Sequence, residues 1–106
     1  MKVVFIDATG SGVTAPAGTT ARSIAEVVAS GLGPEEALVI YAPPPGWEGE
    51  GELLAMLQRS MATAVVVRAE RADGFTEDRL AAACSGLVAG FGQAGIAEAV
   101  AALSKR

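Results

Sequence analysis

A glycine-rich loop near the N-terminus carries the residues with the clearest potential for chemistry. The segment Asp7-Ala8-Thr9-Gly10-Ser11-Gly12 follows an apolar run, and Thr14 comes shortly after it. Backbone N–H groups and hydroxyls in such a loop can bind a phosphate when a helix begins directly after it. The pattern Gly-x-Gly-x-x-Gly is not met, because residue 15 is Ala, and Pro16 follows. The alternative is a flexible loop whose glycines only permit turns.

Asp7 could also have a catalytic role. Asp-x-Thr-Gly after a strand resembles the nucleophile motif of haloacid-dehalogenase-type phosphatases and cation pumps. That resemblance would require a downstream Lys and an acidic pair for Mg²⁺. The lysines of this chain lie near its ends, at Lys2 and Lys105, and Asp73 and Asp78 follow the third apolar run closely. The alternative is that Asp7 caps the loop or ends the strand.

A second loop, Pro43-Pro44-Pro45-Gly46-Trp47, follows another apolar run. Both loops are expected at the carboxyl ends of strands, where open α/β sheets bind ligands. Pro43 and Trp47 therefore join the first loop as predicted ligand-binding residues. Trp47 is either an exposed stacking surface or a plug at the top of the sheet, and its proline neighbours favour the plug.

Composition excludes several classes of function. The chain lacks His and has one cysteine, Cys84, which excludes a Ser-His-Asp or Cys-His nucleophile within one chain and makes a metal site unexpected. The net charge is −4 and no basic stripe exists, so we expect no nucleic-acid partner. No apolar run approaches the roughly 18 residues of a membrane span. We therefore expect a cytoplasmic protein without a membrane partner.

Segments with strand patterns and segments with helical patterns alternate along the chain, which predicts one α/β domain over residues 1–106. Three short runs rich in β-branched residues are continuous rather than alternating, as in parallel strands covered on both faces: Val3–Ile6, Leu38–Tyr41 and Ala64–Val67. Helical patterns follow them at Thr20–Gly31, Gly51–Ala62 and Thr76–Leu103, the last with a break near Gly92–Gly95. The expectation is a β-α-β-α-β-α order, with a three-stranded parallel sheet and three to four helices.

The order of the strands decides how the sheet is covered. If the three strands lie in the order 1-2-3, the right-handed crossover helices all fall on one face, and the other face is bare. A second chain would then have to cover that face, which predicts a dimer. The order 2-1-3 would cover both faces within one chain.

Four segments are similar to parts of the short-chain dehydrogenase/reductase family. Val3–Gly10 resembles its first strand and Thr-Gly turn, and Leu38–Pro43 resembles the strand that ends in its Asn-Asn-Ala-Gly motif. Ala64–Val67 resembles the strand before the catalytic helix, and Gly90–Glu98 resembles the second half of that helix. The resemblance implies a Rossmann-like fold. The cofactor of that family is NAD(P), but the sequence leaves the cofactor of this chain open.

The departures from that family concern its chemistry. The Tyr-x-x-x-Lys pair falls on Ala81 and Ser85, and the catalytic serine falls near Arg68. The cofactor glycines are replaced around Thr19 and Ala21, so the NAD(P) motif is degenerate. The resemblance therefore implies a truncated member without catalytic residues. The family pairs its subunits through the last two helices, which here implies the interface residues Leu54, Leu57, Met61, Leu80, Cys84, Leu87, Val88 and Phe91.

Two classes of function follow from the sequence. The leading hypothesis is a non-catalytic subunit or binding partner that resembles the dehydrogenase/reductase family, forming a homo- or hetero-oligomer, in the second case with an intact reductase. The alternative is a small nucleotide- or phosphate-binding domain that uses Gly10, Ser11, Gly12 and Thr14 for the anion. A carboxylate-based hydrolase is a third reading, but no Asp/Glu pair has convincing spacing for acid–base catalysis.

Overall fold

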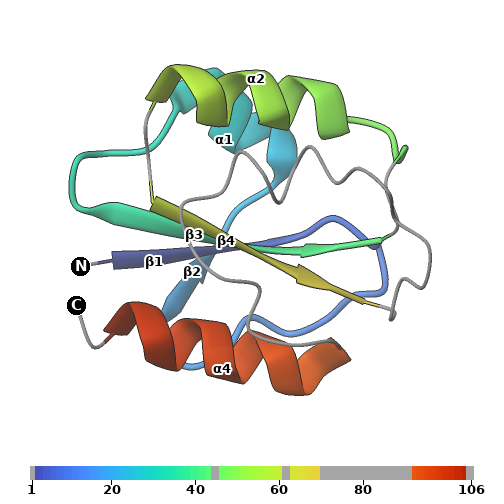
Figure 1. The fold of residues 1–106 in the computed structure, drawn as a ribbon, viewed down its shortest axis with the longest axis vertical. Coiled ribbons are helices and arrows are strands. Elements are labelled where there is room, and N and C mark those ends of the chain that lie inside the picture. The colour runs from blue at the N-terminus through green and yellow to red at the C-terminus, as the bar shows by residue number, and fades with distance from the viewer. Residues whose placement is uncertain (1, 44–45, 61–62, 70–91, 105–106) are drawn as a thin grey trace.

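A parallel β-sheet forms the centre of the molecule (Figure 1). The computed structural model describes residues 2–43, 46–60, 63–69 and 92–104. Within them the sheet has four strands in the order β2-β1-β3-β4, and all neighbours are parallel. The strands are β1 (Lys2–Asp7), β2 (Thr19–Ala21), β3 (Glu36–Ala42) and β4 (Thr63–Arg68). The helices are α1 (Ile24–Ser30), α2 (Glu50–Ser60) and α4 (Gly92–Ser104). The predicted α/β class with a parallel sheet is confirmed.

The number of strands was predicted wrongly, because the sequence analysis missed β2. Thr19 pairs with Val3 and Ala21 pairs with Phe5, both in parallel register. This edge strand has only three residues, and its side chains are largely exposed. Such a segment carries no apolar pattern from which a strand could be recognised.

Helix α1 begins later than the predicted start at Thr20. Ser23 is its N-cap: the Ser23 hydroxyl oxygen accepts a hydrogen bond of 3.1 Å from the backbone N–H of Glu26. A serine in this position satisfies one of the free N–H groups of the first turn, so the helix starts immediately after it. Residues 19–21 remain extended and pair with β1.

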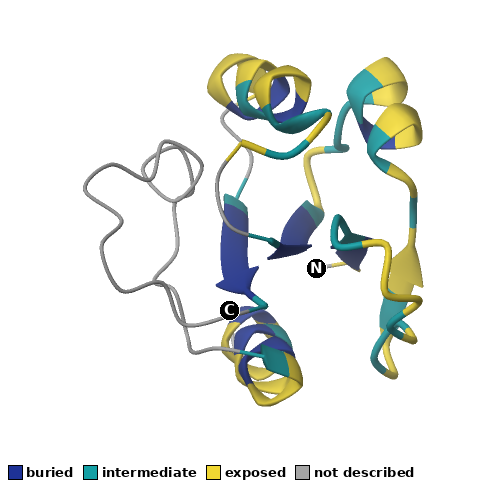
Figure 2. Ribbon diagram, turned by 90° about the vertical axis from the view of Figure 1, so that its right-hand side faces the viewer, coloured by how far each residue is buried: buried dark blue, intermediate teal, exposed yellow. Residues whose placement is uncertain are grey.

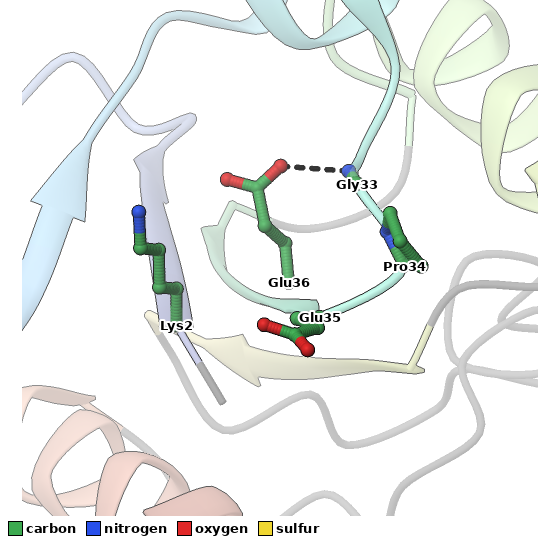
Figure 3. A pocket seen from close by; sticks show the side chains of 5 residues that line it. All are labelled: Lys2, Gly33, Pro34, Glu35 and Glu36. Carbon is green, nitrogen blue, oxygen red and sulfur yellow. Dashed lines mark hydrogen bonds between the residues drawn. The ribbon is translucent and has the colours of Figure 1, made fainter.

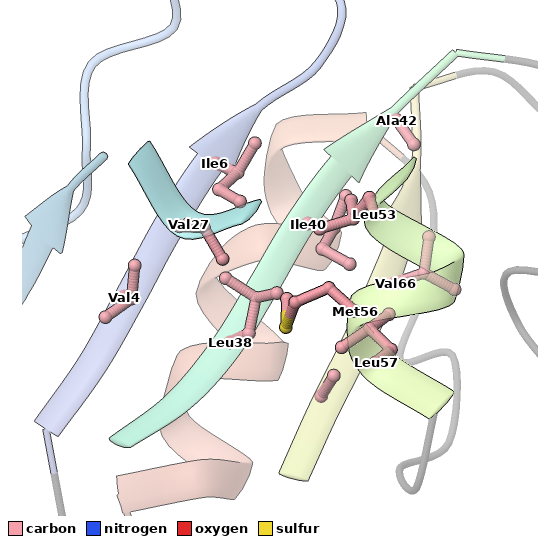
Figure 4. Close-up of a cluster of buried hydrophobic side chains, with 11 residues drawn as sticks. Val4, Ile6, Val27, Leu38, Ile40, Ala42, Leu53, Met56, Leu57 and Val66 are labelled. Carbon is pink, nitrogen blue, oxygen red and sulfur yellow. The ribbon is translucent and has the colours of Figure 1, made fainter. Parts of the chain in front are cut away.

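Alternate residues of the strands build two separate apolar cores. The first core lies between the sheet and the helices α1 and α2 (Figure 4). It contains Val4, Ile6, Val27, Leu38, Ile40, Ala42, Leu53, Met56, Leu57, Ala64 and Val66. The second core lies on the opposite face, where Val3, Phe5, Ala37, Val39, Tyr41, Val65 and Val67 meet Ile96, Ala99 and Leu103 of α4. The continuous apolar strands are therefore buried on both faces, as their composition predicts.

Helix α4 covers the face that was expected to be bare. The strands β1, β3 and β4 do lie in the order 1-2-3, and α1 and α2 share one face. Helix α4 packs on the other face of the sheet (Figure 1). The argument for a dimer from an uncovered sheet is therefore wrong, because a helix after the last strand can reach either face.

The remaining helix boundaries differ little from the predicted ones. Helix α2 spans Glu50–Ser60 where Gly51–Ala62 was predicted, and Met61 and Ala62 lie outside the described residues. Helix α4 begins at Gly92, inside the predicted break, and the predicted helical stretch from Thr76 to Phe91 lies outside the described residues. In the described part of the chain, no helix is both long and apolar enough to span a bilayer.

Candidate functional site

The two loops singled out in the sequence meet at one end of the sheet. The chain leaves β1 toward β2 and leaves β3 toward β4, so the connections diverge between β1 and β3. Open parallel sheets bind ligands at this switch point, beside the carboxyl ends of the strands. Asp7 ends β1 opposite Tyr41 of β3, and the N–H of Ala8 donates to the Tyr41 carbonyl at 2.8 Å. The structure therefore brings the Asp7 loop and the Pro43 loop to the same place.

Asp7 is the centre of the first loop. One oxygen of its carboxylate accepts hydrogen bonds from the backbone N–H of Thr9 at 2.9 Å and from the Thr9 hydroxyl at 2.5 Å. The other oxygen accepts the backbone N–H of Val13 at 3.1 Å. The loop donors thus converge on a carboxylate that belongs to the loop itself.

Two further hydrogen bonds connect Ser11 with Thr9. The backbone N–H of Ser11 donates to the Thr9 hydroxyl oxygen at 3.1 Å, and the two hydroxyl oxygens lie 2.8 Å apart. Gly10 and Gly12 have φ angles of +71° and +72°, in the left-handed region that is costly for other residues. These two glycines let the chain curl around Asp7, while Thr14 is exposed in the same loop.

The surroundings of Asp7 hold its carboxylate in the ionised form. Burial raises the pKa of Asp7, but hydrogen bonds from the side chain and backbone of Thr9 and from the backbone of Val13 and Gly12 lower it. The net result is a pKa below the usual 3.8 of this group. A phosphate at this loop would meet a negative charge and find the N–H groups of Thr9, Ser11 and Val13 already bonded.

In addition, no helix begins directly after this loop. It leads into the edge strand β2, and the first helix, α1, begins only at Ile24. The positive end of a helix dipole therefore does not follow the glycines directly, as it does in phosphate-binding loops. The arrangement does not meet the condition on which the predicted anion site depended.

Trp47 fills the space on the α1 and α2 side of the same end. The residue is half-buried and packs against the first core. A Cβ atom placed on Gly49 would lie 3.7 Å from both the Trp47 ring and the Ile24 side chain, so these two residues converge there. The indole Nε1 is buried and has no hydrogen-bond partner among the described residues, so packing holds the ring. This placement agrees with the plug interpretation.

Arg68 is a residue at this end that sequence reasoning missed as part of the site. It ends β4, is only 3% exposed, and is the one polar or charged residue that is buried in the described ranges. Its Nη1 donates to the Pro43 carbonyl at 2.6 Å, while the N–H of Ala69 donates to the Ala42 carbonyl at 2.9 Å. Arg68 and Ala69 thus bond to two consecutive carbonyls, the last of β3 and the first of the loop after it. An arginine directly after a run of valines is the signal that could have revealed it.

The predicted interface residues are only partly placed by the structure. Leu57 belongs to the first core and is 3% exposed, so its side chain is not presented at the surface of this chain. Leu54 is half-buried. The other residues of that prediction lie outside the described ranges: Met61, Leu80, Cys84, Leu87, Val88 and Phe91.

A shallow cavity of about 390 Å³ lies at the opposite end of the sheet, at the start of β1 and β3 (Figure 3). Its lining consists of Lys2, Gly33, Pro34, Glu35 and Glu36. The Glu36 carboxylate is used within the fold: it accepts the Gly33 N–H at 2.7 Å and lies 3.4 Å from an Arg22 nitrogen. Lys2, Pro34 and Glu35 are exposed, so this is an open depression rather than an enclosed site. No group of three metal-ligating side chains occurs in the residues that the structure describes.

No protein-family model, curated protein or solved structure matches this chain. The resemblance to the short-chain dehydrogenase/reductase family therefore stays a prediction of the sequence analysis.

Proposed function

We propose that this chain is a non-catalytic α/β subunit that binds another polypeptide, and that its own residues fill the place where such sheets bind small ligands. The observation that carries this proposal is the Asp7 carboxylate. It accepts the Thr9 and Val13 N–H groups that a bound anion would otherwise accept. Trp47 supports it from the other loop, because its ring packs against the first core near Ile24 at the start of α1.

The inventory of reactive groups agrees with a non-catalytic role. The chain has no histidine. Where the dehydrogenase/reductase family that it resembles has its catalytic Tyr and Lys, this chain has Ala81 and Ser85. The buried Arg68 guanidinium donates a hydrogen bond to the Pro43 carbonyl in the loop after β3. A Rossmann-like ancestry and a cytoplasmic location belong to the same proposal.

The outer face of α4 is the surface that we infer for the partner. Figure 2 shows this helix buried toward the sheet and exposed on its outer side. The exposed residues from Gln93 to Ala102 include a single charge, Glu98, together with four alanines: Ala94, Ala97, Ala101 and Ala102. The exposed side of α2, by contrast, carries Glu52 and Arg59. Small uncharged side chains let two backbones approach closely, which suits helix α4 to contact with a second polypeptide.

The proposal is tested by sedimentation velocity of the purified chain at micromolar concentrations. We expect reversible self-association that Ala97→Arg weakens at least about tenfold, because a charge at the centre of a tight contact would have to be desolvated. Ala29→Arg is the matched control, since Ala29 is exposed on α1, away from the helices implied for the interface. Equal association of both variants would remove α4 from the interface, and a strictly monomeric wild-type chain would contradict self-association.

Titration with AMP and NAD⁺ separates this proposal from the nucleotide-binding alternative. We expect no saturable binding to the wild-type chain. Saturable chemical-shift changes at Gly10, Ser11 and Gly12 would instead support the alternative function.

A further inference from the structure

The loop after β1 has the geometry of an anion-binding loop with an anion already in it. Three donors from two residues, the N–H and hydroxyl of Thr9 and the N–H of Val13, point at one carboxylate. Gly10 and Gly12 supply the left-handed backbone from which anion-binding concavities are made. The loop lies at the switch point between β1 and β3, where a ligand would be expected.

We propose that Asp7 acts as an internal ligand that closes this loop, and that a small oxyanion such as inorganic phosphate binds there once the carboxylate is removed. A carboxylate oxygen and a phosphate oxygen accept hydrogen bonds from the same donors, so the two compete for one position. In the wild-type chain the ionised Asp7 occupies that position and repels a second anion. The inference concerns this loop alone and goes beyond the proposed role as a subunit.

The residue at position 7 should determine how far the loop is open to an anion. Asp7→Ala removes the carboxylate and leaves the donors of Thr9 and Val13 without their acceptor. Asp7→Asn keeps a side chain of the same size in the loop, with one oxygen acceptor and an amide that cannot accept the second N–H group. The anion site is therefore open in the alanine variant and still largely filled in the asparagine variant.

The experiment is a phosphate titration near neutral pH at constant ionic strength, followed through the amide signals of Thr9, Ser11 and Val13. We expect Asp7→Ala to bind phosphate at least about tenfold more tightly than the wild type, with Asp7→Asn close to the wild type. Glu35→Ala is the charge-matched control, because it removes an exposed carboxylate at the opposite end of the sheet. Its phosphate affinity should equal that of the wild type.

Two results would overturn the inference. One is a folded Asp7→Ala chain whose loop signals respond to phosphate no more than those of Glu35→Ala. The other is equal phosphate affinity in the wild type and in Asp7→Ala.

If the alanine variant is unstable, its thermal midpoint provides a second test. Phosphate or formate should raise the midpoint of Asp7→Ala more than that of Glu35→Ala, and equal shifts would count against the proposal. A variant that ignores phosphate but still self-associates would leave the proposed function standing.

Discussion

Two charged side chains at the carboxyl end of this sheet form hydrogen bonds with the backbone of the loops there. Asp7 accepts N–H groups from the loop after β1, and Arg68 donates to a carbonyl of the loop after β3. Loops at this position cannot satisfy every polar group through strand pairing, and an unsatisfied buried group costs about 1–3 kcal/mol. Asp7 at the end of β1 and Arg68 at the end of β4 reduce that cost by bonding to loop backbone groups. Both residues therefore have a structural role that is independent of any ligand.

The lowered pKa of Asp7 predicts a specific dependence of stability on acidity. A carboxyl group whose pKa is lower in the folded state adds stability above its unfolded pKa of 3.8, and this stability is lost as the pH falls through the folded value. We expect Asp7→Asn to cost about 1–2 kcal/mol at about pH 7, because charged hydrogen bonds are replaced by neutral ones.

Urea unfolding of the wild type and Asp7→Asn over a series of acidic pH values measures this difference. The gap between the two free energies of unfolding should stay constant down to the unfolded pKa and should shrink below it. A gap that is the same in strong acid as at neutrality would show that the Asp7 carboxylate is not held ionised by the loop.

At the scale of elements, the shortest pieces depend on a few polar contacts. Helix α1 has seven residues and buries only Val27 completely, so packing alone gives it little support. Isolated helices of this length are unstable in water. Its first turn is closed by Ser23, and its end is closed by the Gly31 N–H, which donates to the Val27 carbonyl at 2.7 Å. Strand β2, with three residues, depends on its parallel pairing with β1.

Removal of the N-cap should therefore weaken the start of α1. We expect Ser23→Ala to lower the free energy of unfolding by about 1 kcal/mol, since the N–H of Glu26 loses its acceptor. Ser30→Ala, at the exposed last residue of the same helix, should change it by less than about 0.5 kcal/mol. The two variants compared in urea test the cap, and equal effects would contradict it.

At the scale of the whole molecule, a single four-stranded sheet is stabilised by helices on both faces. Among the helices that the structure describes, α1 and α2 pack on the first core, and α4 packs on the second through Ile96, Ala99 and Leu103. A small domain buries a limited share of its surface, so the loss of either layer would be a large fraction of its stability. The attachment of α4 is thus essential to the fold, even though its outer face is free to meet a partner.

Truncation of Leu103 tests the contact between α4 and the sheet. This side chain is 1% exposed, so Leu103→Ala should cost about 2–5 kcal/mol through lost burial and the cavity left behind. Ala102→Ser, at the neighbouring exposed position, is the control and should be nearly neutral. Both values come from urea unfolding followed by circular dichroism. A loss below about 1 kcal/mol for Leu103→Ala would mean that α4 does not seal this face.

The candidate site was foreseeable in its residues but not in its chemistry. Asp7, Thr9, Ser11, Pro43 and Trp47 were singled out because polar and glycine-rich loops follow apolar strands, and the structure places both loops at one end of the sheet. The sequence could not show that Val13 donates to Asp7 from six residues away. The direction of that N–H depends on how the whole loop curls, which no local pattern records.

Local patterns in the sequence determined the long strands, the positions of α2 and α4, and the parallel α/β class, because the periodicity of apolar residues reflects burial directly. Only the tertiary structure decided that Thr19–Ala21 would be a strand, that α4 would cover the second face, and that Arg68 would bond to Pro43. Each of these depends on partners brought together by folding of the chain. Such pairings are chosen by packing and by the satisfaction of buried polar groups, which act between elements rather than within them.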